Sequence, residues 1–450
     1  MKCCVIRNFL MNSNCEAKYF EQDIDHTGEL EGTFQQLYYE TLREAENISN
    51  LKFLFIGGEN ALSTGSVVMN FMSQLADQFL ADKYALEHRY YGQSQPFRNT
   101  SVESLKYLTV DQSLEDIKNF IEVVNNYTPD VCNKWILFGG SYAGNLAAWA
   151  RMMYPELIFG AVSSSAPVQV EFNFKKYLEI TSKLIEEKDA ECKSTIKEGM
   201  KMLVYTFNTK AGKEKLATKF KMCDPPKHQF DKYSLTSFIV ELFTDAVEFN
   251  TKVVNGDRLS LLCIDLKNRK GNSLEKLASL VADHYATGRD CFNYNYNSNQ
   301  DLFKTEINEY NFERQWYYQK CTELGYFQTT GSSEQPFTHS LPLFYYTKLC
   351  KDAFGKNFNE NTIKEGVERT VSKYKVNDLI KVTNLLMVYG SSDPWKNLGI
   401  QSFETDKSKV IFIEDGWHCQ DMIMAVENDS EEVKKSRDEI QNTIEHWCTN

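Results

Sequence analysis

The segment Lys134–Arg151 reads KWILFGGSYAGNLAAWAR and has the layout of a buried strand, a turn of small residues and a helix. Its apolar run Trp135–Phe138 has the length of a strand, and Gly139 and Gly140 end that run. The residues after the turn are mostly alanine and leucine, which are good helix formers. The segment therefore predicts a strand that turns sharply at Ser141 into a helix.

Ser141 stands at this turn in the manner of a nucleophile elbow, in which a serine is exposed between a strand and a helix. The strained backbone of such a turn needs small neighbours, and Gly139 and Ala143 occupy those positions. The usual pattern has glycine in the place of Ala143, so this is a relaxed form of the motif. Free backbone N–H groups at the start of the helix, beginning with Tyr142, would stabilise an oxyanion. Because a serine after two glycines also fits an ordinary turn, the assignment depends on partners elsewhere.

Strand-like and helix-like segments alternate around this turn, which is the pattern of a parallel sheet covered by helices. Residues 171–375 differ, because they are rich in Lys, Glu, Tyr and Phe at helical spacing, as in 184–203 and 274–285. We therefore expect a core of residues 20–170 and 376–450, interrupted by a helical insertion. The expected core strands are 51–56, 84–87, 135–138, 159–162, 385–389 and 410–413, and the expected core helices are 109–124 and 431–447.

An aspartate and a histidine follow the two strands that come after the insertion. Asp393 and His418 lie in loops at the carboxyl ends of these strands, on the same edge of the sheet as Ser141. The chain order Ser, Asp, His is that of an α/β-hydrolase, in which histidine takes the serine proton and aspartate orients the imidazole. Asp393 before a proline also fits a simple turn. Glu414 and Asp415 are too near His418 in the sequence to orient it from a neighbouring loop.

A second oxyanion donor is expected in the loop that follows an early strand. Gly57 and Gly58 come directly after the strand 51–56, where hydrolases of this fold recruit a backbone N–H group. A glycine pair by itself is also typical of a turn. We predict Gly58 as the second donor beside Tyr142.

The composition is that of a globular protein and narrows the function classes. The 450 residues are 42% hydrophobic and 13% aromatic, which is enough for a large core. A net charge of −12 without a basic run argues against a nucleic-acid partner. The sequence contains no run of 18 apolar residues, so it does not predict a membrane-spanning helix. No CxxC pair or HExxH pattern offers a metal site, and no cofactor is implied.

The amino-terminal residues and the cysteines indicate different compartments. Residues 1–15 begin with a basic residue, but Arg7 and Asn8 interrupt the apolar stretch before the core of a signal peptide forms. Twelve cysteines are many for a reduced cytosolic protein. The simplest explanation is a start site that misses a leader, and cytosolic residence is the alternative. Glycosylation acceptor patterns occur at Asn47, Asn99, Asn126 and Asn428.

Several motifs spread along the chain match one known family in the right order. They are GGSYAGNLAAWARMMYP (139–155), SSAP (164–167), EHRYYG (87–92), RQWYYQKCTE (314–323) and DPW (393–395). Together they resemble the serine peptidase family of lysosomal Pro-X carboxypeptidase, dipeptidyl peptidase II and thymus-specific serine protease. The resemblance runs from about residues 19–26 to the carboxyl end. It is greatest for thymus-specific serine protease, which shares the Gly-Gly-Glu after the early strand and the alanine-bearing elbow.

The resemblance implies a hydrolase domain with a helical cap that narrows the cleft, and an exopeptidase that acts on short peptides, often after proline. It carries over Ser141, Asp393 and His418 as the catalytic triad. Family members act in lysosomes or along the secretory route, which favours a lysosomal, vesicular or secreted protein. Trp417 departs from the pattern, because a small residue usually precedes the histidine.

The resemblance also implies disulfide bonds in the insertion. Cys419 beside the histidine is interpreted as a packing residue, since a serine triad is complete without it. The implied pairs are Cys263 with Cys291, Cys321 with Cys350, and Cys192 with Cys223.

The sequence thus predicts a serine exopeptidase of the dipeptidyl-peptidase or Pro-X carboxypeptidase type that works through an acyl-enzyme. An esterase or lipase would use the same triad, and only the cap and the family motifs favour peptide substrates. A binding protein on a hydrolase fold is disfavoured by the intact triad. The direction of cleavage, the need for proline and the oligomeric state, a homodimer included, stay open.

Overall fold

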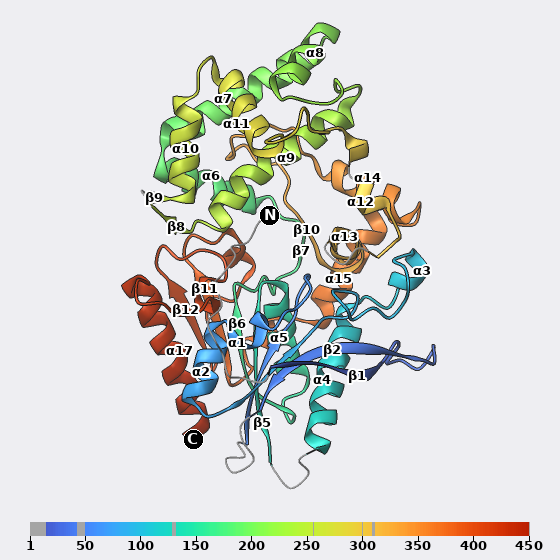
Figure 1. Ribbon diagram of the computed structural model, residues 1–450, viewed down its shortest axis with the longest axis vertical. Coiled ribbons are helices and arrows are strands. Elements are labelled where there is room, and N and C mark those ends of the chain that lie inside the picture. The colour runs from blue at the N-terminus through green and yellow to red at the C-terminus, as the bar shows by residue number, and fades with distance from the viewer. Residues whose placement is uncertain are drawn as a thin grey trace.

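The computed structural model describes residues 15–42, 50–127, 132–254, 256–298, 300–307 and 311–449. Figure 1 shows a sheet flanked by helices in its lower part and a group of helices above the sheet. The chain leaves the sheet after β6 (Ile158–Ser164) and returns to it at β11 (Leu385–Gly390). We call residues 176–354, which run from α6 to α14 between these two strands, the helical layer.

Eight strands form one sheet in the order β1-β2-β4-β3-β5-β6-β11-β12. β2 runs antiparallel to both of its neighbours, and the strands from β4 to β12 run parallel. This order and these directions are those of the α/β-hydrolase fold, so the predicted fold class is confirmed. The remaining strands of the sheet are β1 Glu16–Asp23, β2 Thr33–Thr41, β3 Leu51–Ile56, β4 Asp82–Leu86, β5 Lys134–Gly140 and β12 Lys409–Ile413.

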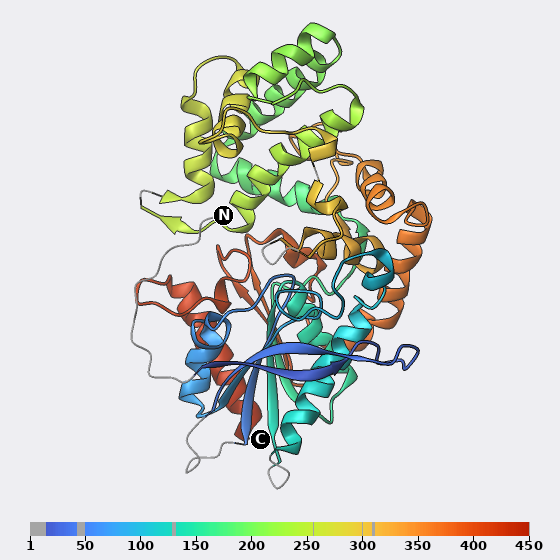
Figure 2. The same ribbon diagram turned by 45° about the vertical axis from the view of Figure 1, so that its right-hand side comes forward.

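Helices cover both faces of the sheet (Figures 1 and 2). Along β5, Ile136 belongs to a core cluster with α2 (Phe71–Gln78) and α17 (Glu431–Thr449). The next residue, Leu137, belongs to the larger cluster with α4 (Val110–Asn126) and α5 (Tyr142–Met153). Because successive side chains of a strand point to opposite faces, the two clusters lie on the two sides of the sheet. Burial on both sides explains why β11 is a continuous apolar run and why the one charged residue of β3, Lys52, is paired with Asp82.

The helical layer is joined to the sheet by a short parallel pair. β7 (Glu171–Asn173), which lies between β6 and the layer, pairs with β10 (Gly325–Phe327) inside the layer. Beyond the layer, α15 (Glu360–Lys373) and α16 (Val376–Leu379) lead back to β11. The longer helices of the layer are α6 Lys176–Lys188, α7 Ala190–Phe207, α8 Lys210–Lys219, α9 Gln229–Glu248, α10 Arg258–Asn268, α11 Ser273–Tyr285, α13 Glu313–Gln319 and α14 Leu343–Phe354. The short elements are α1 Gly65–Val68, α3 Val102–Leu105 and α12 Gln300–Phe303.

Two local features differ from the predicted elements. The stretch 184–203 is not one helix, because Asp189 separates α6 from α7 and its side chain accepts the backbone N–H of Cys192 at 2.9 Å. This is a helix cap, which a short polar side chain favours. Strands β1 and β2 were not among the predicted strands, because they mix polar and apolar side chains on their buried positions, as Gln22 and Gln36 show, and lack an apolar run.

Three disulfide bonds occur in the helical layer, and two of them correct the predicted pairing. Cys321–Cys350 forms as predicted. The pairs Cys263–Cys291 and Cys192–Cys223 were wrong, because the bonds are Cys192–Cys263 and Cys223–Cys291. Cys192 and Cys263 lie on the packed helices α7 and α10. Cys223 lies beside Phe292, whose carbonyl accepts the Cys223 N–H at 3.0 Å. The tertiary contacts of the layer therefore decide the pairing.

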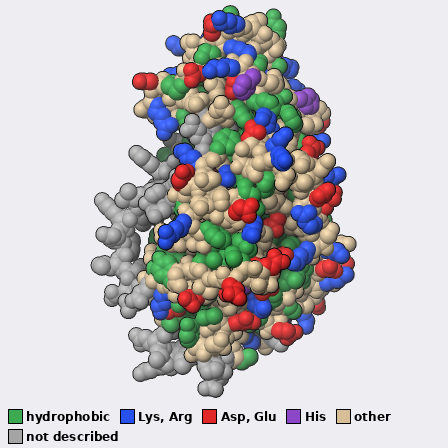
Figure 3. Space-filling model, turned by 90° about the vertical axis from the view of Figure 1, so that its right-hand side faces the viewer, with side chains coloured by type: hydrophobic (Ala, Val, Ile, Leu, Met, Phe, Trp, Pro, Cys, Tyr) green, Lys and Arg blue, Asp and Glu red, His purple; other side chains and the backbone are tan. Residues whose placement is uncertain are grey.

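The surface carries three of the predicted glycosylation candidates. Asn99, Asn126 and Asn428 are exposed, whereas Asn47 lies outside the described residues. On the face shown in Figure 3, acidic and basic side chains are interspersed. None of the described helices is both long enough and apolar enough to cross a membrane.

Candidate active site

Ser141 occupies a strained turn between β5 and α5. Its backbone angles are φ 56° and ψ −128°, a region that residues with a side chain rarely adopt. The turn is held against β6, because the Ser141 N–H donates to the carbonyl of Ser164 at 2.8 Å. A Cβ atom at Gly139 would lie 2.2 Å from the carbonyl oxygen of Ala143, so only glycine fits there. The predicted elbow is therefore built as a tight turn that presents one serine.

Asp393 and His418 come together at the carboxyl ends of β11 and β12. The Nδ1 atom of His418 lies 2.9 Å from Oδ2 of Asp393, and both side chains are buried. The other carboxylate oxygen of Asp393 accepts the backbone N–H of Trp395 at 2.9 Å. Asp393 thus starts a turn and also orients the imidazole. Since Nδ1 faces a carboxylate, it carries the proton, which leaves Nε2 of His418 free to accept one.

The loop of His418 lies directly against the elbow of Ser141. A Cβ atom at Gly140 would lie 2.9 Å from Sγ of Cys419, the residue after the histidine. The backbone N–H of Cys419 also donates to Oγ of Ser165 at 2.9 Å. Within the described residues, the Ser141 hydroxyl forms no hydrogen bond, which leaves it free for a ligand or for His418. Such catalytic bonds often tighten only when substrate binds.

The electrostatic surroundings of His418 favour its cationic form. Burial by itself lowers the pKa of His418, but the charge of Asp393 outweighs burial and holds that pKa well above its ordinary value. An imidazole that accepts a proton at this place is therefore stabilised as a cation.

The two predicted oxyanion donors flank the elbow. Tyr142 is the first residue of α5, so its N–H lies at the start of a helix. A Cβ atom at Gly58 would lie 3.4 Å from the Cβ atom of Ala143, which puts the loop after β3 against the same turn. Both backbones lie beside Ser141, and their role as donors stays a prediction.

A buried polar network underneath the elbow escaped the sequence analysis. The Tyr142 hydroxyl lies 3.1 Å from Nε2 of His88 and accepts Nε2–H of Gln319 at 2.8 Å. The Tyr91 hydroxyl donates to Oε1 of Gln319 at 2.6 Å. Burial lowers the pKa of His88 to about 4, so this histidine is neutral. His88, Tyr91 and Gln319 belong to the motifs 87–92 and 314–323, and those motifs were the signal that marked them.

A second contact from the helical layer also reaches the site. Glu248, at the end of α9, has its Oε1 atom 3.9 Å from Nε2 of His418. Burial raises the pKa of both Glu248 and Glu59, and each interacts electrostatically with His418. Nothing in the local sequence distinguishes Glu248 from the many other glutamates of the layer.

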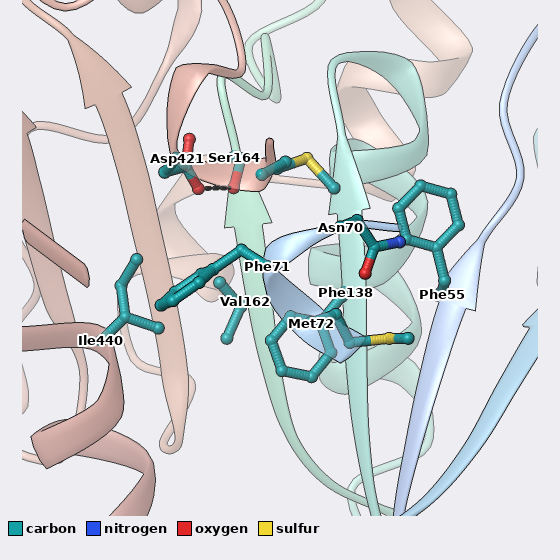
Figure 4. A pocket seen from close by; sticks show the side chains of 10 residues that line it. Phe55, Asn70, Phe71, Met72, Phe138, Val162, Ser164, Asp421 and Ile440 are labelled. Carbon is teal, nitrogen blue, oxygen red and sulfur yellow. Dashed lines mark hydrogen bonds between the residues drawn. The ribbon is translucent and has the colours of Figure 1, made fainter. Parts of the chain in front are cut away.

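A small cavity lies behind β6, next to the loop of His418 (Figure 4). Its volume of about 10 Å³ has room for one water molecule and not for a peptide. Asp421 accepts a hydrogen bond from Ser164 at its wall, and burial raises the pKa of Asp421 to about 6. The described residues hold no group of three or more His, Cys, Asp or Glu side chains suited to a metal ion.

Comparison with known proteins places the chain among serine peptidases. A family model described as serine carboxypeptidase S28 matches residues 22–440. A putative serine protease of Caenorhabditis elegans, K12H4.7, is 32% identical over 96% of this chain and 88% of its own length. Human thymus-specific serine protease is 28% identical over 88% of this chain and 79% of its own. Human lysosomal Pro-X carboxypeptidase is 25% identical over 91% of this chain and 83% of its own.

Proposed function

We propose that this chain, which belongs to the serine carboxypeptidase S28 family and is a serine peptidase, removes residues from one end of short peptides. The observation that carries the proposal is the pairing of His418 with Asp393 at 2.9 Å beside the strained elbow of Ser141. A buried carboxylate, an oriented imidazole and a partly exposed serine in this arrangement are what acyl transfer requires.

In the first half of the reaction, Nε2 of His418 takes the proton of Ser141 as Oγ attacks the carbonyl carbon of the scissile bond. The N–H groups of Tyr142 and Gly58 donate to the oxyanion that forms. The imidazolium, stabilised by Asp393, gives its proton to the leaving amine as the C–N bond breaks. The result is an ester between Ser141 and the acyl part of the peptide.

In the second half, a water molecule takes the place of the amine. His418 accepts a proton from this water as its oxygen attacks the ester carbonyl, and the same two N–H groups hold the oxyanion. The C–O bond to Ser141 then breaks, and the serine oxygen recovers its proton from His418. No cofactor takes part in either half.

The exopeptidase part of the proposal rests on the helical layer. Its residues Gln319 and Glu248 reach the elbow and the histidine loop, respectively. We assign this layer, within the insertion of residues 171–375, as a cap that restricts the site to the ends of short peptides. A preference for cleavage near proline is inferred from the name of the relative lysosomal Pro-X carboxypeptidase.

A lysosomal, vesicular or secreted location agrees with two features of the chain. Three disulfide bonds suit an oxidising compartment. Three exposed acceptor asparagines are available for glycosylation. To test this location, the protein is made in a eukaryotic host and treated with an enzyme that removes Asn-linked glycans. A drop in the mass of the protein is the expected result.

Labelling with a serine-reactive fluorophosphonate tests the nucleophile. The wild type is expected to label, Ser141→Ala not to label, and Asp393→Asn to react about 10⁴-fold more slowly. Asp415→Asn is the matched control, because Asp415 is an exposed carboxylate three residues before His418. An equal loss of labelling rate in Asp393→Asn and Asp415→Asn would contradict the assignment of the triad. Full labelling of Ser141→Ala would also contradict it.

Substrate panels then separate the remaining functions. Dipeptidyl amides with a free amino end and peptides ending in Pro-X distinguish the two directions of cleavage. Cleavage of one of them, but not of the same peptide blocked at that end, supports the exopeptidase. Turnover of simple esters without any peptide cleavage would favour an esterase, and a wild type that never labels would favour a binding protein.

A further inference from the structure

The carboxyl end of α9 touches His418 at two points. The backbone N–H of His418 donates to the backbone carbonyl of Glu248 at 3.0 Å. The Oε1 atom of the same residue lies 3.9 Å from Nε2 of His418. One residue of the helical layer thus contacts both the main chain and the reactive nitrogen of the catalytic histidine.

Aromatic packing fixes the end of α9 at this place. The ring of Phe249 meets the imidazole of His418 edge to face, with centroids 5.9 Å apart. The same ring also meets Trp417 at 6.4 Å. The tryptophan that departs from the family pattern therefore serves as a contact for α9.

The carboxylate of Glu248 is oriented by its own partner. The hydroxyl of Tyr177, on α6, donates to Oε2 of Glu248, which leaves Oε1 facing His418. The Tyr177 ring packs against Trp395 at 5.2 Å, and Trp395 lies 6.4 Å from the His418 ring. Among the described residues, no Lys or Arg forms an ion pair with Glu248. His418 is therefore the only described cationic partner of this carboxylate.

Several other charged or titratable groups face His418. Asp393 holds Nδ1, Cys419 follows in the chain, and both raise the pKa of His418. Glu59 from the loop after β3 and Asp421 from the loop after β12 also interact with it electrostatically. Glu248 differs from all of them, because it alone forms an ion-pair contact at Nε2, the atom that exchanges protons with Ser141.

We propose that Glu248 is a positioning residue of the catalytic histidine, through which the helical layer orients the imidazole and stabilises its protonated form. This inference rests on the proposed role of His418 as the base. An opposite charge within about 4–6 Å favours the charged form of a group. Since Nε2 gains its proton in each half-reaction, a carboxylate beside that atom stabilises the imidazolium when it forms.

The pH dependence of fluorophosphonate labelling tests this proposal without any peptide substrate. Labelling needs neutral His418, so its rate rises with pH through the pKa of the histidine. Glu248→Gln keeps the shape and removes the charge, which destabilises the imidazolium and lowers that pKa. We expect the midpoint of the rise to move down by about one pH unit. Glu214→Gln, an exposed carboxylate on α8, is the control and should leave the midpoint unchanged.

Two further measurements separate positioning from a structural role. Glu248→Asp retains the charge and should restore much of the wild-type midpoint. Tyr177→Phe removes the bond that orients the carboxylate, and it should shift the midpoint in the same direction by a smaller amount. A midpoint that stays in place in Glu248→Gln, with the labelling rate lowered by the same factor at every pH, would overturn the proposal. An equal shift of the midpoint in Glu214→Gln would also overturn it.

The failure of this inference is distinguishable from failure of the proposed function. If the wild type does not label, the catalytic assignment itself is wrong. If the wild type labels but Glu248→Gln does not fold, Tyr177→Phe and Glu248→Asp carry the test, because an unmoved midpoint in Tyr177→Phe would overturn the proposal. Thermal unfolding of each variant identifies those that fold.

Discussion

Gln319 of the helical layer donates a hydrogen bond over 2.8 Å to the hydroxyl of Tyr142, the residue that follows Ser141 in the chain. The Nδ1 atom of His88 faces the carbonyl of Arg89 at 2.7 Å, so Nδ1 carries the proton of this neutral ring. Nε2 of His88 is then an acceptor for the Tyr142 hydroxyl. The Ser113 hydroxyl lies 2.9 Å from the same nitrogen, so the two hydroxyls share one acceptor, and the bond from Gln319 ties the helical layer to the elbow.

Gln319→Leu should lower both stability and catalysis. The substitution leaves the Tyr91 hydroxyl without its acceptor, and an unpaired buried group costs about 1–3 kcal/mol, whereas the Tyr142 hydroxyl loses one partner and keeps His88. Denaturant unfolding measures the loss of stability. We also expect kcat/KM to fall by about 10-fold, since the first residue of α5 is less firmly held.

Tyr142→Phe provides the matching half of a double-mutant cycle. The two residues share one hydrogen bond, so the double variant Gln319→Leu/Tyr142→Phe should lose less stability than the sum of the single variants. Strictly additive losses would mean that the bond contributes nothing to the folded protein.

Gly139→Ala should abolish labelling of Ser141, whereas Ala143→Gly should preserve it. The new methyl group at position 139 would lie 2.2 Å from the carbonyl oxygen of Ala143, and the backbone cannot yield without opening the elbow. Glycine at position 143 is the usual residue of the motif and costs about 1 kcal/mol in helix propensity. Labelling and thermal unfolding of the two variants check this contrast, and equal labelling of both would refute it.

The core of the fold and the acid–base pair could be predicted because local patterns determine them. The run 51–56 has the bounds of β3, since a strand buried on both faces is mostly apolar, and its one charged residue, Lys52, is paired with Asp82. Asp393 and His418 could be paired because parallel strands bring the loops at their carboxyl ends together. Whether these residues act as predicted is left to the experiments above.

Contacts between distant helices could not be predicted in this way. Glu248 reaches His418 from a helix that ends far from it in the sequence, and the surrounding layer is rich in similar glutamates. The pairing of Cys192 with Cys263 depends on the packing of α7 on α10, which no periodicity of a single helix encodes. Strands β1 and β2 lack an apolar run because two buried glutamines, Gln22 and Gln36, lie among their apolar residues and are hydrogen-bonded to each other at 2.8 Å.

Peptide mapping of the unreduced protein should recover the corrected disulfide pairs. Proteolytic fragments joined through Cys192 and Cys263, and others joined through Cys223 and Cys291, are expected by mass spectrometry. Replacing both Cys321 and Cys350 by serine should lower stability by about 3–4 kcal/mol, because that bond joins residues with a sequence separation of 29. Fragments that join Cys192 to Cys223 would contradict the described packing of α7 and α10.

Asp421→Asn should stabilise the protein most at alkaline pH. Burial raises the pKa of Asp421 to about 6, so the folded state favours the protonated carboxyl. The stability that this group contributes is therefore complete below about pH 4 and is lost as the pH rises through 6. A rise of about two units in the pKa of Asp421 corresponds to a loss of about 3 kcal/mol in the free energy of unfolding. Asp421→Asn should recover this loss at pH 8 and about half of it at pH 5. Urea unfolding at the two pH values measures the difference.

Asp438→Asn, an exposed carboxylate on α17, is the control and should show no such trend. An equal gain for Asp421→Asn at both pH values would mean that asparagine improves the hydrogen bonding to Ser164 and that the buried charge is not the cause.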